Sequence, residues 1–67
     1  MLHNDIYPKG LKVKVKIPNY PNKVGNLTSG KPIRMDNGVG FSVTIGKSKY
    51  TIHQDYLFRI RPQGVVL

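Results

Sequence analysis

Residues 11–17 read LKVKVKI, a strict alternation of apolar and basic side chains. Successive side chains of a β-strand point to opposite faces of a sheet, so this period of two predicts a half-buried strand. Its apolar face carries Leu11, Val13, Val15 and Ile17. Three lysines occupy the other face. Pro18 ends the strand, because proline has no N–H to donate to a neighbouring strand.

The composition of the whole chain favours β structure. Its 67 residues include no alanine and no glutamate, which are strong helix formers. Valine, isoleucine, threonine, tyrosine and phenylalanine recur instead, and these residues suit a pleated sheet. Seven glycines and five prolines divide the chain into short segments. A chain of this length forms one small domain.

Working outward from residues 11–17, alternation and turn residues predict four more strands. They cover residues 24–28, 41–45, 49–52 and 57–61. Residues 33–35 have the pattern of a strand stub, and 53–56 that of a single 3₁₀ turn. Five short strands predict an all-β fold, a small closed or nearly closed barrel, since closure protects edge strands. The expected organisation is a lead-in at 1–10, the barrel at 11–61 and a tail at 62–67.

The barrel's inward face follows from the same alternation. The expected core is Val13, Val15, Ile17, Val24, Leu27, Phe41, Val43, Ile45, Tyr50, Ile52, Leu57 or Phe58, and Ile60. Apolar residues of the lead-in, namely Leu2, Ile6 and Tyr7, are expected to pack across one mouth of the barrel.

The charge of the chain is strongly one-sided. Eleven Lys and Arg face three Asp, which gives a formal charge of +8. Such an imbalance repels itself in the compact state and favours a negatively charged partner. Nucleic acid is the first candidate, an acidic protein surface the second and an anionic membrane the third.

Nine residues are the candidates for contacting nucleic acid. They are Lys12, Lys14, Lys16, Tyr20, Lys23, Lys47, Lys49, Arg59 and Arg61. The first three lysines lie roughly 7 Å apart along one strand face, comparable with the spacing of phosphates along a nucleic-acid strand. The same three lysines equally fit a solvent-exposed strand face whose charges prevent a sheet edge from pairing with another chain. Tyr20 lies between two prolines and suits either base stacking or a ring folded over the barrel mouth.

Nothing in the sequence predicts catalysis. The three carboxylates are isolated, no nucleophile has a supporting triad, and so small a domain is expected to lack a pocket of about 300 Å³. His3-Asn4-Asp5 and His53-Gln54-Asp55 repeat a His-x-Asp pattern, but ordinary turn residues explain it better than a metal site. We therefore predict no enzyme activity, no cofactor, no metal and no small-molecule substrate, in a monomer or small homo-oligomer.

The expected compartment is the cytoplasm. No stretch is apolar enough to span a bilayer, and residues 1–5 lack the basic start and apolar run of a signal peptide. The chain has no cysteine, so no disulfide and no thiolate zinc site can form.

The run from Leu11 to Ile60 resembles an SH3-like barrel of the KOW type, which occurs in ribosomal and transcription-elongation proteins. Asn22-Lys23-Val24-Gly25-Asn26-Leu27 is similar to the "G-K-x-G-x-V/I" segment of that type, with Asn22 in place of its first glycine. The layout is also similar to the small basic SH3-like subunit of photosystem I that docks ferredoxin. A chain this short also resembles small phage products.

The resemblance and the charge together imply a module that binds the nucleic-acid backbone with little sequence preference, in transcription or translation. The alternative is a protein-docking module, with Tyr20, the Pro18–Lys23 loop and the tail Val65-Val66-Leu67 as anchors. Its partner would be an acidic surface on RNA polymerase, the ribosome or a redox carrier.

Overall fold

The structure is a computed structural model that describes residues 1–60. Arg61 and the 62–67 tail lie outside the described residues. The chain is all-β, with six strands and one 3₁₀ turn. The elements are β1 (Lys12–Val15), β2 (Lys23–Leu27), β3 (Ile33–Met35), β4 (Gly38–Ile45), β5 (Ser48–His53), η1 (Gln54–Tyr56) and β6 (Leu57–Arg59).

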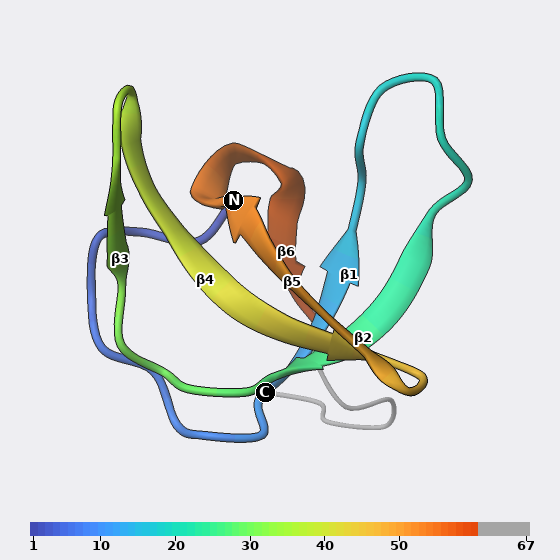
Figure 1. Cartoon of the computed structure of the whole chain (residues 1–67), viewed down its shortest axis with the longest axis horizontal. Coiled ribbons are helices and arrows are strands. Elements are labelled where there is room, and N and C mark those ends of the chain that lie inside the picture. Colours follow the sequence, from blue (N-terminus) through green and yellow to red (C-terminus); the bar gives the residue numbers. More distant parts are fainter. Residues whose placement is uncertain (61–67) are drawn as a thin grey trace, which may run out of the picture.

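A single antiparallel sheet contains all six strands and curls into a half-barrel (Figure 1). Its path runs β3-β4-β2-β1-β6, and β5 joins the free edge of β4. The long strand β4 therefore pairs with β2 and β3 along one edge and with β5 along the other. This curled sheet is compatible with an SH3-like barrel.

Two features of the predicted barrel are wrong. The sheet has six strands and not five, because residues 33–35 pair fully with β4 and are more than a stub. The barrel is also not closed, because β6 pairs with β1 and β5 pairs with β4, so no ladder joins β5 to β6. The three residues of η1 carry the chain from one strand to the other across the open side.

The core lies inside the curl of the sheet. Its fully buried members are Leu2, Val13, Val15, Leu27, Phe41, Val43, Ile52 and Leu57. The alternation in residues 11–17 is confirmed, since Val13 and Val15 are buried between exposed or half-buried lysines. Of the two alternatives at the last strand, Leu57 is the buried one. Ile17, Ile45 and Ile60 are half-buried.

Two members of the expected core are wrong. Val24 is 52% exposed, because the inward position on β2 belongs to Gly25. A Cβ on Gly25 would lie 2.7 Å from the Thr44 carbonyl oxygen, so β4 packs directly on a bare backbone there. Tyr50 is 51% exposed although it pairs with the fully buried Val43, because within residues 1–60 no strand pairs with the outer edge of β5.

The lead-in is part of the folded body. The Leu2 N–H donates to the Leu57 carbonyl oxygen, and the Tyr7 N–H donates to the Gly30 carbonyl oxygen. A Cβ on Gly30 would overlap the Tyr7 carbonyl, so only glycine permits this close approach. The expected packing across the mouth is confirmed for Leu2 and Tyr7 and wrong for Ile6, which is 72% exposed.

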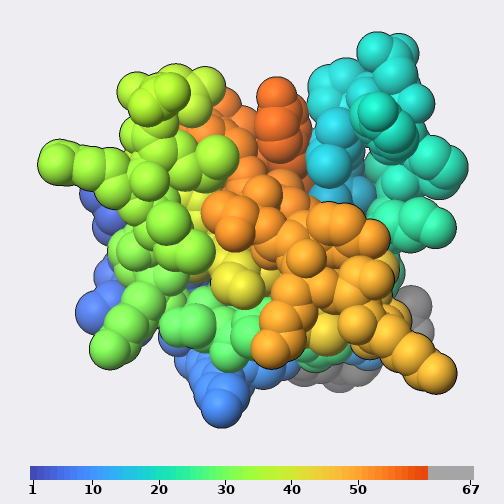
Figure 2. Space-filling view, viewed as in Figure 1, coloured from blue at the N-terminus to red at the C-terminus, as the bar shows by residue number. Residues whose placement is uncertain are grey.

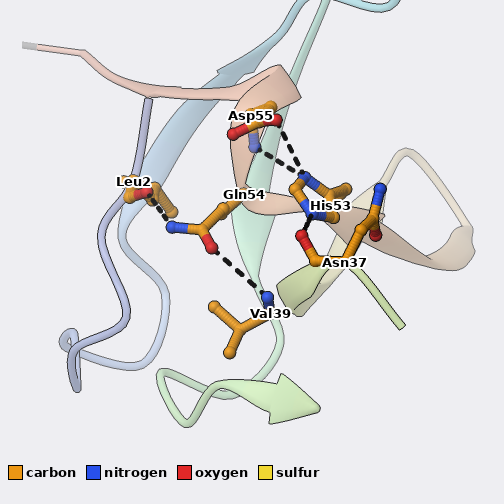
Figure 3. A network of polar contacts seen from close by, with 6 residues as sticks. All are labelled: Leu2, Asn37, Val39, His53, Gln54 and Asp55. Atoms are coloured by element: carbon orange, nitrogen blue, oxygen red, sulfur yellow. Dashed lines mark hydrogen bonds and ion pairs between the residues drawn. The ribbon is translucent and has the colours of Figure 1, made fainter. Parts of the chain in front are cut away.

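A polar network joins η1 to the lead-in and to the β3–β4 turn (Figure 3). The Gln54 amide donates to the Leu2 carbonyl oxygen and accepts from the Val39 N–H. His53 Nε2 lies 2.9 Å from the Asn37 carbonyl oxygen, and His53 Nδ1 accepts from the Asp55 N–H. A carbonyl only accepts and a peptide N–H only donates, so both bonds require the neutral ring with its proton on Nε2. His53, not Asp55, thus caps the 3₁₀ turn.

Truncating Leu2 should destabilise the domain severely, because its side chain is 2% exposed and fills the mouth of the core. We expect Leu2→Ala to lower the free energy of unfolding by about 2–5 kcal/mol. That is comparable with the roughly 3–5 kcal/mol that so small a core supplies in total. Urea unfolding followed by tyrosine fluorescence measures the change. Ile6→Ala is the matched control and should change stability by less than about 0.5 kcal/mol. Equal effects of the two would show that the lead-in does not dock.

Gln54→Leu tests the polar network. It keeps the side-chain size but leaves the Leu2 carbonyl and the Val39 N–H without their partner. We expect a loss of about 1–3 kcal/mol in the free energy of unfolding. Asp55→Asn serves as control, because the Asp55 side chain is exposed and its carboxylate lies 3.6 Å from His53 Nδ1, beyond hydrogen-bond distance. This variant should change the free energy of unfolding by less than about 0.5 kcal/mol. A Gln54→Leu variant as stable as the parent would mean that these bonds contribute nothing.

Candidate binding surfaces

The first candidate surface is the outer lysine face, which we define as Lys12, Lys14, Lys16 and Lys49 on the convex side of the sheet. The three β1 lysines alternate with buried valines and so point away from the core. The register of the sheet brings Lys49 to the same side. Lys12 pairs with Asn26 on β2, and Asn26 pairs with Thr44 on β4. Thr44 in turn pairs with Lys49 on β5.

This alignment forms one row across four adjacent strands. Strands lie about 4.8 Å apart, so Lys12 and Lys49 start roughly 14 Å apart along the row. The two residues between them are polar and short. Thr44 is held by a 2.6 Å hydrogen bond to Thr28, and the Asn26 amide donates to the Gly10 carbonyl. The row is thus a rigid polar strip with a cation at each end.

The outer lysine face also includes an aromatic contact. Lys16 Nζ lies 5.1 Å from the centre of the Phe58 ring, within the range of a cation–π interaction. Phe58 pairs with Lys14 across the β1–β6 ladder, which explains why Lys14 is half-buried. Two of the four lysines are therefore partly ordered by a neighbouring ring on β6.

The three acidic residues lie outside the strands that carry this face. Asp5 is on the lead-in, Asp36 is in the β3–β4 turn and Asp55 is in η1. The β3–β4 turn lies at the opposite end of β4 from the β4–β5 turn (Figure 1). Within residues 1–60 the structure contains no ion pair between a Lys or Arg and an Asp. The positive charge of the outer lysine face is therefore not neutralised within that part of the chain.

The other predicted site residues are scattered. Lys47 lies in the β4–β5 turn beside Lys49 and is exposed. Arg59 is exposed on β6, opposite Val13. Tyr20 and Lys23 lie on the other side of the sheet, at a groove described next. Arg61 lies outside the described residues.

The second candidate surface is the apolar groove, a hollow of about 410 Å³ beside β5. Its walls are the end of β1, the β1–β2 loop and the β4–β5 hairpin, and in Figure 2 the loop (cyan) stands next to β5 (orange). The apolar lining is Val15, Ile17, Tyr20, Ile45, Tyr50 and Ile52. Among the described residues that line it, Lys23 is the one cationic side chain and none is a carboxylate.

The expectation that the domain has no pocket of about 300 Å³ is wrong. A closed barrel of this size would fill its interior with side chains. Because no ladder joins β5 to β6, the inner face of the sheet instead opens to solvent along β5. Tyr20, at 70% exposure, and Tyr50, at 51%, stand at this opening without filling it.

Sequence reasoning missed Tyr50 as a surface residue, and it did not include Asn26 or the outward-facing Thr44 in a candidate binding surface. Tyr50 alternates in phase with the buried Ile52, so its pattern alone resembles a core residue. Its position three residues after the Gly46-Lys47 turn was the available indication that it lies near the end of the hairpin. The row through Asn26 and Thr44 depends on the registers of three strand pairs, which no local pattern in the sequence indicates.

A second hollow, of about 530 Å³, lies between the β3–β4 hairpin and Gln54. It is polar, and Arg34 and Asp36 both line it, so it carries no dominant charge. The two His-x-Asp segments do not build a metal centre within residues 1–60, where no cluster of three or more potential ligands occurs. His53 instead uses both ring nitrogens in the η1 network.

Comparisons with protein-family models, with curated proteins and with solved structures each find no match. No helix in residues 1–60 has the length and apolar character needed to cross a membrane.

Proposed function

We propose that this protein is a nucleic-acid-binding module that contacts the phosphate backbone through its outer lysine face. The observation that carries the proposal is the row that joins Lys12 to Lys49. These lysines are 37 positions apart in the sequence, yet the sheet register aligns them on one polar strip with no acidic residue.

The chemistry of the face suits phosphate rather than base recognition. A lysine ammonium is a compact point charge that attracts a phosphate without demanding one orientation. Within residues 1–60 the face is made of lysines, without the planar guanidinium fork that matches the two acceptors of a guanine edge. Phosphate contacts position a protein on nucleic acid but do not carry sequence information. The proposed binding therefore has little sequence preference.

The fold supports the same proposal. The curled sheet is compatible with an SH3-like barrel, and the segment Asn22–Leu27 is similar to the KOW-type motif of ribosomal and transcription-elongation proteins. In this proposal the module acts in transcription or translation. The net charge of +8 raises the rate of encounter with any polyanion before the specific face is engaged.

Salt dependence tests the proposal. Contacts from the four lysines of the outer lysine face would give a slope of about −3.6 for log K against log salt on duplex DNA, at roughly 0.9 per phosphate contact. Fluorescence anisotropy with labelled duplex and single-stranded DNA and RNA measures the slope. We expect submicromolar binding that persists near physiological salt. Binding that vanishes there would reject the function and leave only generic attraction.

A pair of double variants locates the site. Lys12→Gln with Lys49→Gln should reduce the slope on duplex DNA by about 1.8, because both ends of the row are neutralised. Lys31→Gln with Arg34→Gln removes the same charge from exposed positions at the opposite end of β4 and should leave the slope unchanged. Equal losses in the two variants would show that net charge matters and the outer lysine face does not.

A further inference from the structure

The outer edge of β5 is free for pairing within the described part of the chain. β5 pairs only with β4, and the ladder is closed by the Ile45–Ser48 pair around the two-residue turn Gly46-Lys47. Gly46 has a φ of 61°, as the first central residue of a type II′ hairpin turn requires. In such a hairpin the closing pair is hydrogen-bonded, and hydrogen-bonded pairs then alternate along the ladder.

The alternation specifies which backbone groups face outward. Ser48, Tyr50 and Ile52 exchange hydrogen bonds with β4. The N–H and C=O groups of Lys49 and Thr51 therefore point away from β4, toward the open side of the half-barrel. No backbone bond within residues 1–60 joins either residue to another loop. The corresponding edge of β6 is different, because Leu2 donates to Leu57 there.

The apolar groove runs along this same edge. Tyr50, Thr51 and Ile52 form its β5 wall, and Ile17 and Tyr20 stand on the opposite wall. An extended chain laid beside Lys49 and Thr51 would thus bond to the edge and place alternate side chains over the groove. The intervening side chains would project to the outer face, where Lys49 and Lys47 lie.

Charge indicates the chemistry of such a chain. Lys23 lies at the groove, Lys47 and Lys49 lie at the hairpin, and no carboxylate from residues 1–60 lines the groove. We propose that the β5 edge binds an extended acidic peptide segment by strand addition, with alternate apolar residues in the groove and acidic residues facing Lys49. In this mode the main chain supplies affinity and the alternate side chains supply specificity.

A peptide fits this edge better than a nucleic-acid strand does. The edge offers both donors and acceptors from Lys49 and Thr51, and a second peptide backbone satisfies both kinds. A phosphate accepts hydrogen bonds but donates none at neutral pH, so the edge carbonyls would lose water without gaining a partner. This inference goes beyond the proposed function and does not depend on it: the two sites share Lys49, but the apolar groove and the free backbone groups of the β5 edge belong to the peptide site alone.

The direct test is amide hydrogen exchange by NMR on the full chain, with an eight-residue peptide of alternating valine and glutamate. In the free protein the Lys49 and Thr51 amides should exchange rapidly and those of Tyr50 and Ile52 slowly. Saturation with peptide should slow exchange at Lys49 and Thr51 by roughly tenfold or more. A peptide of the same composition, with four valines followed by four glutamates, should bind at least tenfold more weakly.

N-methylation of the peptide provides a test that leaves the protein unchanged. Along an extended strand the N–H groups of alternate residues point to opposite edges. Methylating all valine nitrogens or all glutamate nitrogens should therefore abolish binding in one case and preserve it in the other. On the protein side, Tyr50→Ala should weaken binding by roughly tenfold, whereas Tyr56→Ala, an exposed tyrosine on η1 outside the groove, should not.

Several results would overturn the inference. Equal binding of the alternating and block peptides, without protection of Lys49 and Thr51, would reduce the interaction to charge alone. Tolerance of both N-methylated peptides would exclude strand addition. Protection of the two amides by a single-stranded oligonucleotide instead of the peptide would assign the groove to nucleic acid. Concentration-dependent protection without any ligand would assign the edge to a second copy of this chain. Binding of nucleic acid to the outer lysine face is tested separately, by the two double variants described above.

Discussion

The pairing of β4 is the constraint on which the rest of the structure depends. This strand carries β2 and β3 along one edge and β5 along the other, so its register sets which residues of half the chain face inward. The same register aligns Thr44 with Lys49 on the outside and Val43 with Tyr50 on the inside. Both candidate surfaces are therefore consequences of one strand's hydrogen-bonding pattern.

The open side of the sheet affects both the stability of the domain and its surface. A small core with no disulfide has little stability to spare, and the lead-in compensates by placing Leu2 in the mouth and bonding it to Leu57 and Gln54. The side along β5 has no such cover within residues 1–60. Tyr20 and Tyr50 stay exposed at the opening, and an unpaired strand edge remains beside them. The unpaired strand edge beside an apolar lining distinguishes this groove from an ordinary depression in a protein surface.

The two surfaces divide the molecule by chemistry. The outer lysine face is convex and positively charged, with a polar strip between Lys12 and Lys49. The apolar groove is concave, with two tyrosines and a single lysine at its margin. Lys49 lies on β5 between them. A protein of this size that uses both faces would join a nucleic acid to an acidic protein segment across one layer of sheet.

The sequence by itself determined the β class, the strand at residues 11–17, the 3₁₀ turn and the positive charge, because each depends on residues that are neighbours along the chain. Alternation also located most of the core, but it failed at Val24 and Tyr50. At Val24 the failure came from β4 packing on the bare backbone of Gly25, and at Tyr50 it came from the open side of the half-barrel along β5. Only the tertiary structure decided that β5 and β6 do not pair with each other, that Leu2 fills the mouth of the core and that Lys12 shares a row with Lys49. These outcomes depend on registers between distant strands, and a register is fixed by the whole set of packing contacts and not by any local pattern.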